Sequence, residues 1–204
     1  MADARVIAIL LAGGESLRMG TPKPLLDWGG QTLVEYQVSQ LREAGAEKVI
    51  VVLGHRAEEV LPHVHQAGAQ AIINELYVEG RASSVRVAAG ALPEATRAIV
   101  VLNVDQPRPA WATRRLLEEQ ERVGALVAVP TFDGKRGHPV VFDACLAPEL
   151  REVREATEGM RAVMEAHSAD VLEVSFDTPV VVLDMNVPEE YEEAKVSYFE
   201  QVKR

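Results

Sequence analysis

Residues 6–26, which read VIAILLAGGESLRMGTPKPLL, decide the fold of this 204-residue chain. The first part, Val6–Leu11, is a short and fully apolar run, which is typical of a strand buried on both faces of a parallel sheet. The glycines that follow allow the backbone to approach a phosphate closely and to direct its N–H groups at it. Arg18 and Lys23 add positive charge to the same loop. The stretch therefore predicts a strand followed by an anion-binding loop.

Two common phosphate-binding loops do not fit this spacing. Five residues separate Gly14 from Gly20, and Lys23 follows a proline, whereas a P-loop needs four residues between its glycines and then Gly-Lys-Ser/Thr. The dinucleotide-binding pattern G-x-G-x-x-G is absent from the stretch as well. The alternative to a binding loop is a strand–turn–helix connection whose basic residues face solvent.

Strand-like and helix-like segments alternate along the rest of the chain. Apolar, mostly β-branched runs predict strands at Val49–Leu53, Ala98–Leu102, Leu126–Val129, Val140–Phe142, Val171–Val174 and Val180–Leu183. Amphipathic segments predict helices at Leu33–Ala44, Arg56–Gln66, Ser83–Leu92, Trp111–Val123 and Pro188–Val202. This order indicates an α/β protein, a three-layer α/β/α sandwich with a Rossmann-like, mostly parallel sheet and a small antiparallel addition in the strand-rich later part. Because no linker or repeat interrupts the pattern, residues 1–204 are expected to form a single domain.

Composition excludes several functional classes. The chain is 48% apolar and 25% charged, with a net charge of −10 at pH 7. We expect no nucleic-acid partner, because phosphate backbones attract lysine and arginine. We also expect no membrane partner and no signal peptide, because no apolar run approaches the roughly 20 residues of a membrane helix and the first residues are not strongly basic. A single cysteine, Cys145, excludes an intramolecular disulfide and favours the reducing cytoplasm.

Acidic residues follow two of the predicted strands. In a parallel α/β sheet, ligands bind beyond the carboxyl ends of the strands. Asp105 follows Ala98–Leu102 and Asp184 follows Val180–Leu183, so both carboxylates reach the glycine loop if these strands run parallel to the first. One or two carboxylates beside a phosphate site meet the needs of Mg²⁺. Alternatively, Asp105 shapes a turn, and Asp184 or Asn186 simply precedes the C-terminal helix.

The pattern Leu11-Ala12-Gly13-Gly14-x-Ser16-x-Arg18-Met19-Gly20-x-x-Lys23-x-Leu25-Leu26 resembles the signature of the MobA-like nucleotidyltransferases. The resemblance implies the nucleotide-diphospho-sugar transferase type of fold and an enzyme of the EC 2.7.7 type, which moves a nucleoside monophosphate from an NTP to a phosphorylated acceptor and releases pyrophosphate. It implies Arg18, Lys23 and Asp105 as catalytic residues and Mg²⁺ as the cofactor, held by Asp105 and Asp184, with Asn186 as the alternative second ligand. The nucleotide-binding residues that it implies are Leu11, Ala12, Gly13, Gly14, Arg18, Lys23, Ser83, Ser84 and Asp105.

Further motifs resemble individual branches of this family. Gly137-His138-Pro139 is similar to the acceptor-facing motif of the molybdenum-cofactor cytidylyltransferases, and Ser83-Ser84 to a nucleotide-binding stretch of the same branch. Ala12-Gly13-Gly14 looks more like the guanylyltransferase branch. The resemblance therefore favours CTP over GTP as the donor, molybdopterin as the acceptor and a molybdoenzyme-maturation partner.

Each of these motifs also has a purely structural interpretation. Ser83 and Ser84 can cap a helix, and His138 can be a turn residue before proline. The alternatives at the level of function are a nucleotidyltransferase for a sugar phosphate or another small phosphate, and a nucleotide-binding regulatory module that has lost turnover.

Overall fold

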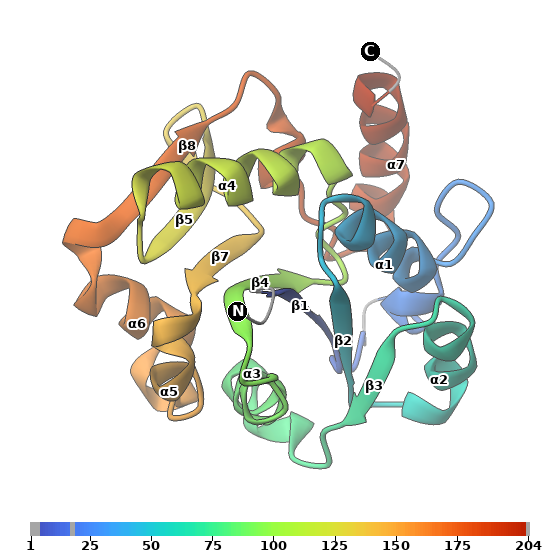
Figure 1. The fold of residues 1–204 in the computed structure, drawn as a ribbon. Coiled ribbons are helices and arrows are strands. Elements are labelled where there is room, and N and C mark those ends of the chain that lie inside the picture. Colours follow the sequence, from blue (N-terminus) through green and yellow to red (C-terminus); the bar gives the residue numbers. More distant parts are fainter. Residues whose placement is uncertain (1–4, 17–18, 203–204) are drawn as a thin grey trace.

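The computed structural model describes residues 5–16 and 19–202 of the chain. The central sheet has eight strands in the order β3-β2-β1-β4-β7-β5-β6, with β8 also paired to β5. Figure 1 shows the sheet with helices on both of its sides. The strands are β1 (Arg5–Ala12), β2 (Lys48–Leu53), β3 (Gln70–Ile73), β4 (Thr96–Asn103), β5 (Val127–Phe132), β6 (Lys135–Arg136), β7 (Val140–Asp143) and β8 (Val171–Ser175).

The sheet has a parallel half and a mixed half. Strand β1 pairs in parallel with β2 and β4, and β2 pairs in parallel with β3. Strand β7 is antiparallel to both of its neighbours, β4 and β5, whereas β8 is parallel to β5. The expected mostly parallel sheet with a small antiparallel addition is therefore confirmed.

Helices cover both faces of the sheet and complete the three layers. They are α1 (Leu33–Glu43), α2 (Ala57–Gln66), α3 (Arg81–Gly90), α4 (Ala110–Val123), α5 (Ala147–Leu150), α6 (Met160–Ala166) and α7 (Pro188–Val202). Alternate residues of β1 point to opposite faces: Ala8 and Leu10 join the core under α1, α2, α4 and α7, while Ile7 and Ile9 join the core under α3, α5 and α6. The apolar run from Val6 to Ala12 within β1 thus follows from its place between two layers of helices (Figure 1).

Helix α1 begins at a capping motif whose residue types are visible in the sequence. The Thr32 hydroxyl accepts a hydrogen bond from the Glu35 N–H at 3.4 Å, and the Glu35 carboxylate accepts one from the Thr32 N–H at 2.8 Å. This reciprocal capping satisfies two N–H groups that the first turn leaves free. None of the helices within the described residues combines the length and the hydrophobicity needed to cross a bilayer.

One predicted strand is wrong. Val180–Leu183 forms no strand; instead, Pro179–Val182 is a 3₁₀ helix. Pro179 lacks an N–H and suits a first helical turn, and the Thr178 hydroxyl accepts a hydrogen bond from the Val180 N–H at 3.3 Å. The valines still supply buried apolar surface, which explains why the run looks like a strand. The short elements β3, β6 and α5 were not predicted.

Candidate functional site

The glycine loop follows β1 at the carboxyl edge of the sheet and forms one wall of a cleft. A Cβ atom on Gly13 would lie 3.2 Å from the backbone nitrogen of Gly54, which is closer than an ordinary van der Waals contact, so the glycine helps the chain to pass closely just beyond the ends of β1 and β2. We call this space the glycine-loop cleft; it is lined by Leu11, Ala12, Gly13, Gly14, Glu15, Ser16, Lys23, Pro24, Tyr77, Gly80, Arg81, Ser84, Asn103, Val104, Asp105, Glu155 and Asn186.

Lys23 crosses the cleft from the far end of the same loop. Its backbone N–H donates to the Ser16 hydroxyl at 3.1 Å, which fixes the loop around the cleft. Its ammonium lies 2.6 Å from Asp105 Oδ2 and 3.4 Å from Asn186 Oδ1. These two oxygens come from positions 82 and 163 residues away along the chain, and they converge on one cation. A positive charge and two acceptor oxygens therefore meet beside the glycine loop.

The register of the sheet brings Asp105 to this place. Strands β1 and β4 are parallel neighbours, and the N–H of Val104 continues their pairing by donating to the Leu11 carbonyl at 2.9 Å. Asp105 follows directly and lines the cleft. The rule that ligands bind beyond the carboxyl ends of parallel strands thus applies to this residue.

The segment that follows the 3₁₀ helix places Asn186, rather than Asp184, in the cleft. The N–H of Met185 donates to the Asp105 carbonyl at 3.2 Å, so the segment lies against the end of β4 although it is not a strand. The Met185 side chain is fully buried, whereas Asp184 is exposed and does not line the cleft. The Asp184 carboxylate accepts a hydrogen bond from the Met185 N–H at 3.0 Å.

The start of α3 forms the opposite wall of the cleft, and only one of the two serines of the Ser83-Ser84 motif lies on that wall. Ser84 lines the cleft, but Ser83 is buried and donates to the carbonyls of Leu76 and Gly80 at 2.9 and 2.8 Å. The Asn74 amide donates to both hydroxyls. Ser83 therefore supports the loop before α3 rather than facing the cleft.

Several lining residues were not singled out from the sequence. Glu155 reaches the cleft from a segment distant in sequence, and its Oε2 accepts a hydrogen bond from the Ala82 N–H at 2.9 Å. Tyr77 contributes an aromatic side chain beside His55, with ring centroids 6.0 Å apart. Arg81, at the start of α3, contributes a cation. The sequence signal for Tyr77 and Arg81 is their closeness to the Ser83-Ser84 motif.

The Gly137-His138-Pro139 motif lies next to the cleft without lining it. A Cβ atom on Gly137 would lie 1.9 Å from the Val181 carbonyl oxygen, so only glycine fits there. The His138 N–H donates to the same carbonyl at 3.0 Å, and the peptide bond between His138 and Pro139 is cis. The motif therefore supports the segment that leads to Asn186.

Burial keeps the His138 imidazole neutral. Desolvation, helped by the positive charge of Arg108, lowers the pKa of His138 to about 4. Below pH 6.5 the unfolded chain binds a proton at this position that the folded chain does not bind, so stability falls as the pH falls from 6.5 towards 4. Neutral imidazole is the form present at pH 7.

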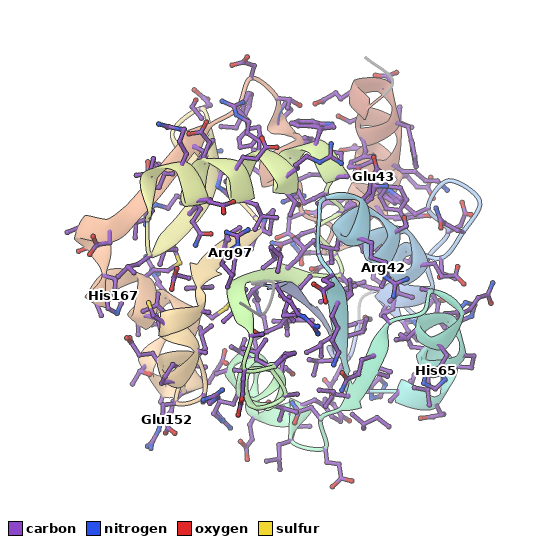
Figure 2. The ribbon with its side chains drawn as sticks, viewed as in Figure 1. Arg42, Glu43, His65, Arg97, Glu152 and His167 are labelled. Atoms are coloured by element: carbon purple, nitrogen blue, oxygen red, sulfur yellow. The ribbon has the colours of Figure 1, made fainter. Side chains whose placement is uncertain are left out.

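Replacing His138 with glutamine is expected to weaken the pH dependence of stability. Wild-type protein should lose about 2 kcal/mol of unfolding free energy through His138 between pH 7 and pH 5, and the variant should not show this loss. Urea denaturation at both pH values measures the difference. His65→Gln is the matched control, because His65 is exposed on α2 (Figure 2). A variant with the same pH dependence as the wild type would contradict the assignment.

The structure does not place one residue of the predicted site. Arg18 lies outside the residues that the structure describes, so its role stays a prediction. Within residues 5–16 and 19–202, no three His, Cys, Asp or Glu side chains gather into a metal-binding cluster. Asp105 and Asn186 instead offer one carboxylate and one amide oxygen near each other. Hard oxygen donors of this kind fit Mg²⁺, which takes the rest of its ligands from water and substrate phosphates.

Comparison with known proteins places the chain among nucleotide-dependent enzymes. The sequence profile of the MobA-like NTP transferase domain matches residues 8–171. The chain is 31% identical over 166 residues to nicotine blue oxidoreductase of Paenarthrobacter nicotinovorans, covering 78% of this chain and 81% of that protein. It is 34% identical over 168 residues to a "Probable molybdenum cofactor guanylyltransferase" of Opitutus terrae, covering 81% of each.

Other relatives are longer proteins. The chain spans 41% of a bifunctional IPC transferase and DIPP synthase of Rubrobacter xylanophilus, with 36% identity over 183 residues. Among solved structures, Rv0371c of Mycobacterium tuberculosis superposes with a TM-score of 0.82 and 27% identity, covering 97% of this chain and 100% of that one. A structure of the same protein in complex with manganese has a TM-score of 0.76 and 26% identity, covering 95% of this chain and 99% of that one.

Proposed function

The chain belongs to the MobA-like NTP transferase family, and on that premise we propose that it transfers CMP from CTP to a phosphorylated acceptor, with molybdopterin as the favoured acceptor. The observation that carries the proposal is the 2.6 Å contact between Lys23 Nζ and Asp105 Oδ2 in the glycine-loop cleft. A cation and a carboxylate beside a glycine loop suit a reaction between two anions, in which positioning and charge neutralisation supply most of the rate.

The proposed reaction needs no covalent enzyme intermediate. An oxygen of the acceptor phosphate attacks the α-phosphorus, the bond from that phosphorus to the oxygen bridging it to the β-phosphorus breaks, and pyrophosphate leaves with the electron pair. Backbone N–H groups of Gly13 and Gly14 would bind the triphosphate, and Lys23 would offset its charge. Arg18, on the same loop, would add a second cation. These roles require binding and orientation only.

Asp105 and Asn186 would hold the divalent cation. Lys23 Nζ already lies where their oxygens converge, which marks a position favourable to positive charge. The manganese complex of a structural relative supports a divalent cation for this fold. When bound, Mg²⁺ would offset charge on the triphosphate. The chain's own contribution is the fixed placement of one carboxylate and one amide oxygen.

Two observations bear on the acceptor and the base. The neutral His138 and its flanking Gly137 and Pro139 lie next to the cleft, where the resemblance to the cytidylyltransferase branch puts the acceptor. The Ala12-Gly13-Gly14 sequence and the guanylyltransferase relative support GTP as the alternative donor. The product of a molybdopterin reaction would then pass to a molybdoenzyme-maturation partner. A sugar phosphate is the alternative acceptor.

Pyrophosphate release by the wild-type chain tests this function. The assay offers CTP and GTP in parallel with Mg²⁺ and molybdopterin cofactor, followed by a panel of sugar phosphates. We expect release with CTP, and a product whose mass equals the acceptor plus CMP less water. Release with a different combination of nucleotide and acceptor would change the assignment of the base or of the acceptor. Consumption of a nicotinamide cofactor without pyrophosphate release, or nucleotide binding without any turnover, would overturn the proposal.

Replacing Asn186 with alanine is expected to raise the Mg²⁺ concentration needed for half-maximal turnover by about tenfold, because one oxygen ligand is lost. Asp184→Asn should raise it by less than about threefold, since that carboxylate is exposed outside the cleft lining. Binding of Mn²⁺ in the presence of the nucleotide, followed by electron paramagnetic resonance, measures the same effect without turnover. The reverse pattern would assign the second ligand to Asp184.

A further inference from the structure

Arg108 is a buried cation beside the cleft whose role the reaction chemistry does not yet explain. It lies in the connection between β4 and α4, three residues after Asp105, and only 1% of its surface is exposed. Arginine is almost never buried to this extent without a charged partner. In the sequence it follows a proline and has the appearance of an ordinary loop residue.

The Arg108 guanidinium donates to carbonyl groups of three separate segments. Its Nε donates to the His138 carbonyl at 2.7 Å, its Nη1 to the Pro107 carbonyl at 2.8 Å, and its Nη2 to the Leu183 carbonyl at 2.8 Å. Each of these segments carries or adjoins a residue of the site. Pro107 belongs to the segment of Asp105, and Leu183 to the segment that ends at Asn186.

Within residues 5–16 and 19–202 the guanidinium forms no ion pair with a carboxylate; its hydrogen-bond partners are the three carbonyls. Burial lowers the pKa of Arg108 to about 9, and the negative charges of Asp184 and Asp105 oppose the shift from a distance. At pH 7 the residue is therefore positive. Well-packed apolar side chains often replace buried charges without loss of stability, so stability alone does not account for a cation here. The planar, fork-shaped guanidinium, in contrast, holds three carbonyl groups in place at once, which no apolar side chain does.

The backbone of Arg108 is fixed from the other side by Gln37 of α1. The Arg108 N–H donates to Gln37 Oε1 at 3.2 Å, and Gln37 Nε2 donates to the Gln106 carbonyl at 2.8 Å. The Gln106 side chain in turn accepts from the Asn103 amide at 2.9 Å. The segment from Asn103 to Arg108 is thus held in one conformation, so the guanidinium is a fixed point to which the other two segments attach.

We propose that Arg108 is a positioning residue that joins the segments of Asp105, His138 and Asn186 into one site. The proposal rests on the proposed nucleotidyl transfer, for which Asp105 and Asn186 must face the same cation. Removing the fork would release the segments at Leu183 and His138, and the oxygen of Asn186 would no longer be held near Asp105. Misplacement of reacting groups by about 1 Å is enough to lower a rate about 100-fold.

Three variants test this role. Arg108→Met removes the charge and all three hydrogen bonds. Arg108→Lys keeps the charge but cannot reproduce the planar fork. Arg42→Met is the matched control: Arg42, on α1 (Figure 2), also donates to two backbone carbonyls, those of Ala67 and Gly68, but at the surface and away from the cleft.

Amide hydrogen exchange of the wild type and the variants gives a readout independent of activity. In Arg108→Met we expect at least about tenfold faster exchange at the N–H groups of His138 and Met185, whose backbone acceptors are the Val181 and Asp105 carbonyls. Arg108→Lys should show the same pattern to a smaller degree. Exchange in β1 and β2 should be unchanged. Arg42→Met should affect only the contact between α1 and α2.

Steady-state kinetics complete the test. For Arg108→Met we expect kcat to fall about 100-fold while KM for the nucleotide changes less than about threefold, with Arg108→Lys intermediate. A wild-type kcat in Arg108→Met, faster exchange throughout the sheet, or a loss of rate without faster exchange at His138 and Met185 would each overturn the proposal. If Arg108→Met does not fold, wild-type exchange and kcat in Arg108→Lys would overturn it. Absence of transfer in the wild type would refute the proposed function instead, and the exchange data would still show whether Arg108 joins the segments.

Discussion

Replacing Asp105 with asparagine is expected to lower the rate of nucleotidyl transfer at least about 1000-fold. The substitution preserves shape but removes the negative charge on which Lys23 Nζ, 2.6 Å away, depends for its position. It also removes the carboxylate proposed to hold the divalent cation. A neutral amide is a poorer ligand for Mg²⁺ than a carboxylate, so the nucleotide would bind without being oriented for attack.

The loss should be one of turnover and not of folding. The Lys23–Asp105 pair is only partly exposed, with 13% and 21% of the two side chains accessible, and asparagine keeps an oxygen that accepts a hydrogen bond from the Lys23 ammonium. Asp133→Asn is the control, because Asp133 is exposed in a turn with a positive φ, which asparagine tolerates. Turnover of Asp105→Asn within tenfold of the wild type, in protein that melts normally, would remove Asp105 from the reaction.

The fold was largely predictable because its central strands are buried on both faces. The run Val6–Leu11 is apolar throughout, and the structure confirms it as part of β1 between two layers of helices. Edge elements lack that signal: β3, Gln70–Ile73, has no fully buried residue. Val180–Leu183 has the composition of a strand, but Pro179 and Thr178 start a 3₁₀ helix that buries Val180 and Val181.

The fold rule predicts the place of a site residue where that residue directly follows a parallel strand, and it gives no answer for residues in irregular segments. Asp105 continues directly from a parallel strand, so the rule for carboxyl ends applies to it. The choice between Asp184 and Asn186 depends on the burial of Met185 between them, which turns one side chain outwards and the other towards Lys23. Burial of Arg108 depends on contacts with segments 30 and 75 residues away, and these leave no local pattern in the sequence.

Helix α7 extends the domain beyond the residues matched by the family profile, and an aromatic cluster holds it in place. Trp28 is fully buried, and its ring lies 5.2 Å from that of Tyr198 and 5.5 Å from that of Phe199, both on α7. The Tyr36 hydroxyl of α1 lies 2.7 Å from that of Tyr198. Because α7 begins two residues after Asn186, this cluster also anchors one end of the site.

Replacing Trp28 with alanine is therefore expected to lower the free energy of unfolding by about 3–5 kcal/mol, since it opens a large cavity between α1 and α7. Trp111→Ala is the matched control: Trp111 is 39% exposed and contacts the Phe176 ring at a centroid distance of 5.9 Å, so its loss should lower the free energy by about 1 kcal/mol. The chain has two tryptophans, so each variant keeps one to report urea unfolding by fluorescence. Because the cluster anchors α7 next to Asn186, folded Trp28→Ala protein should also need more Mg²⁺ for turnover, whereas Trp111→Ala should not. Equal destabilisation by the two substitutions would show that the cluster does not hold α7.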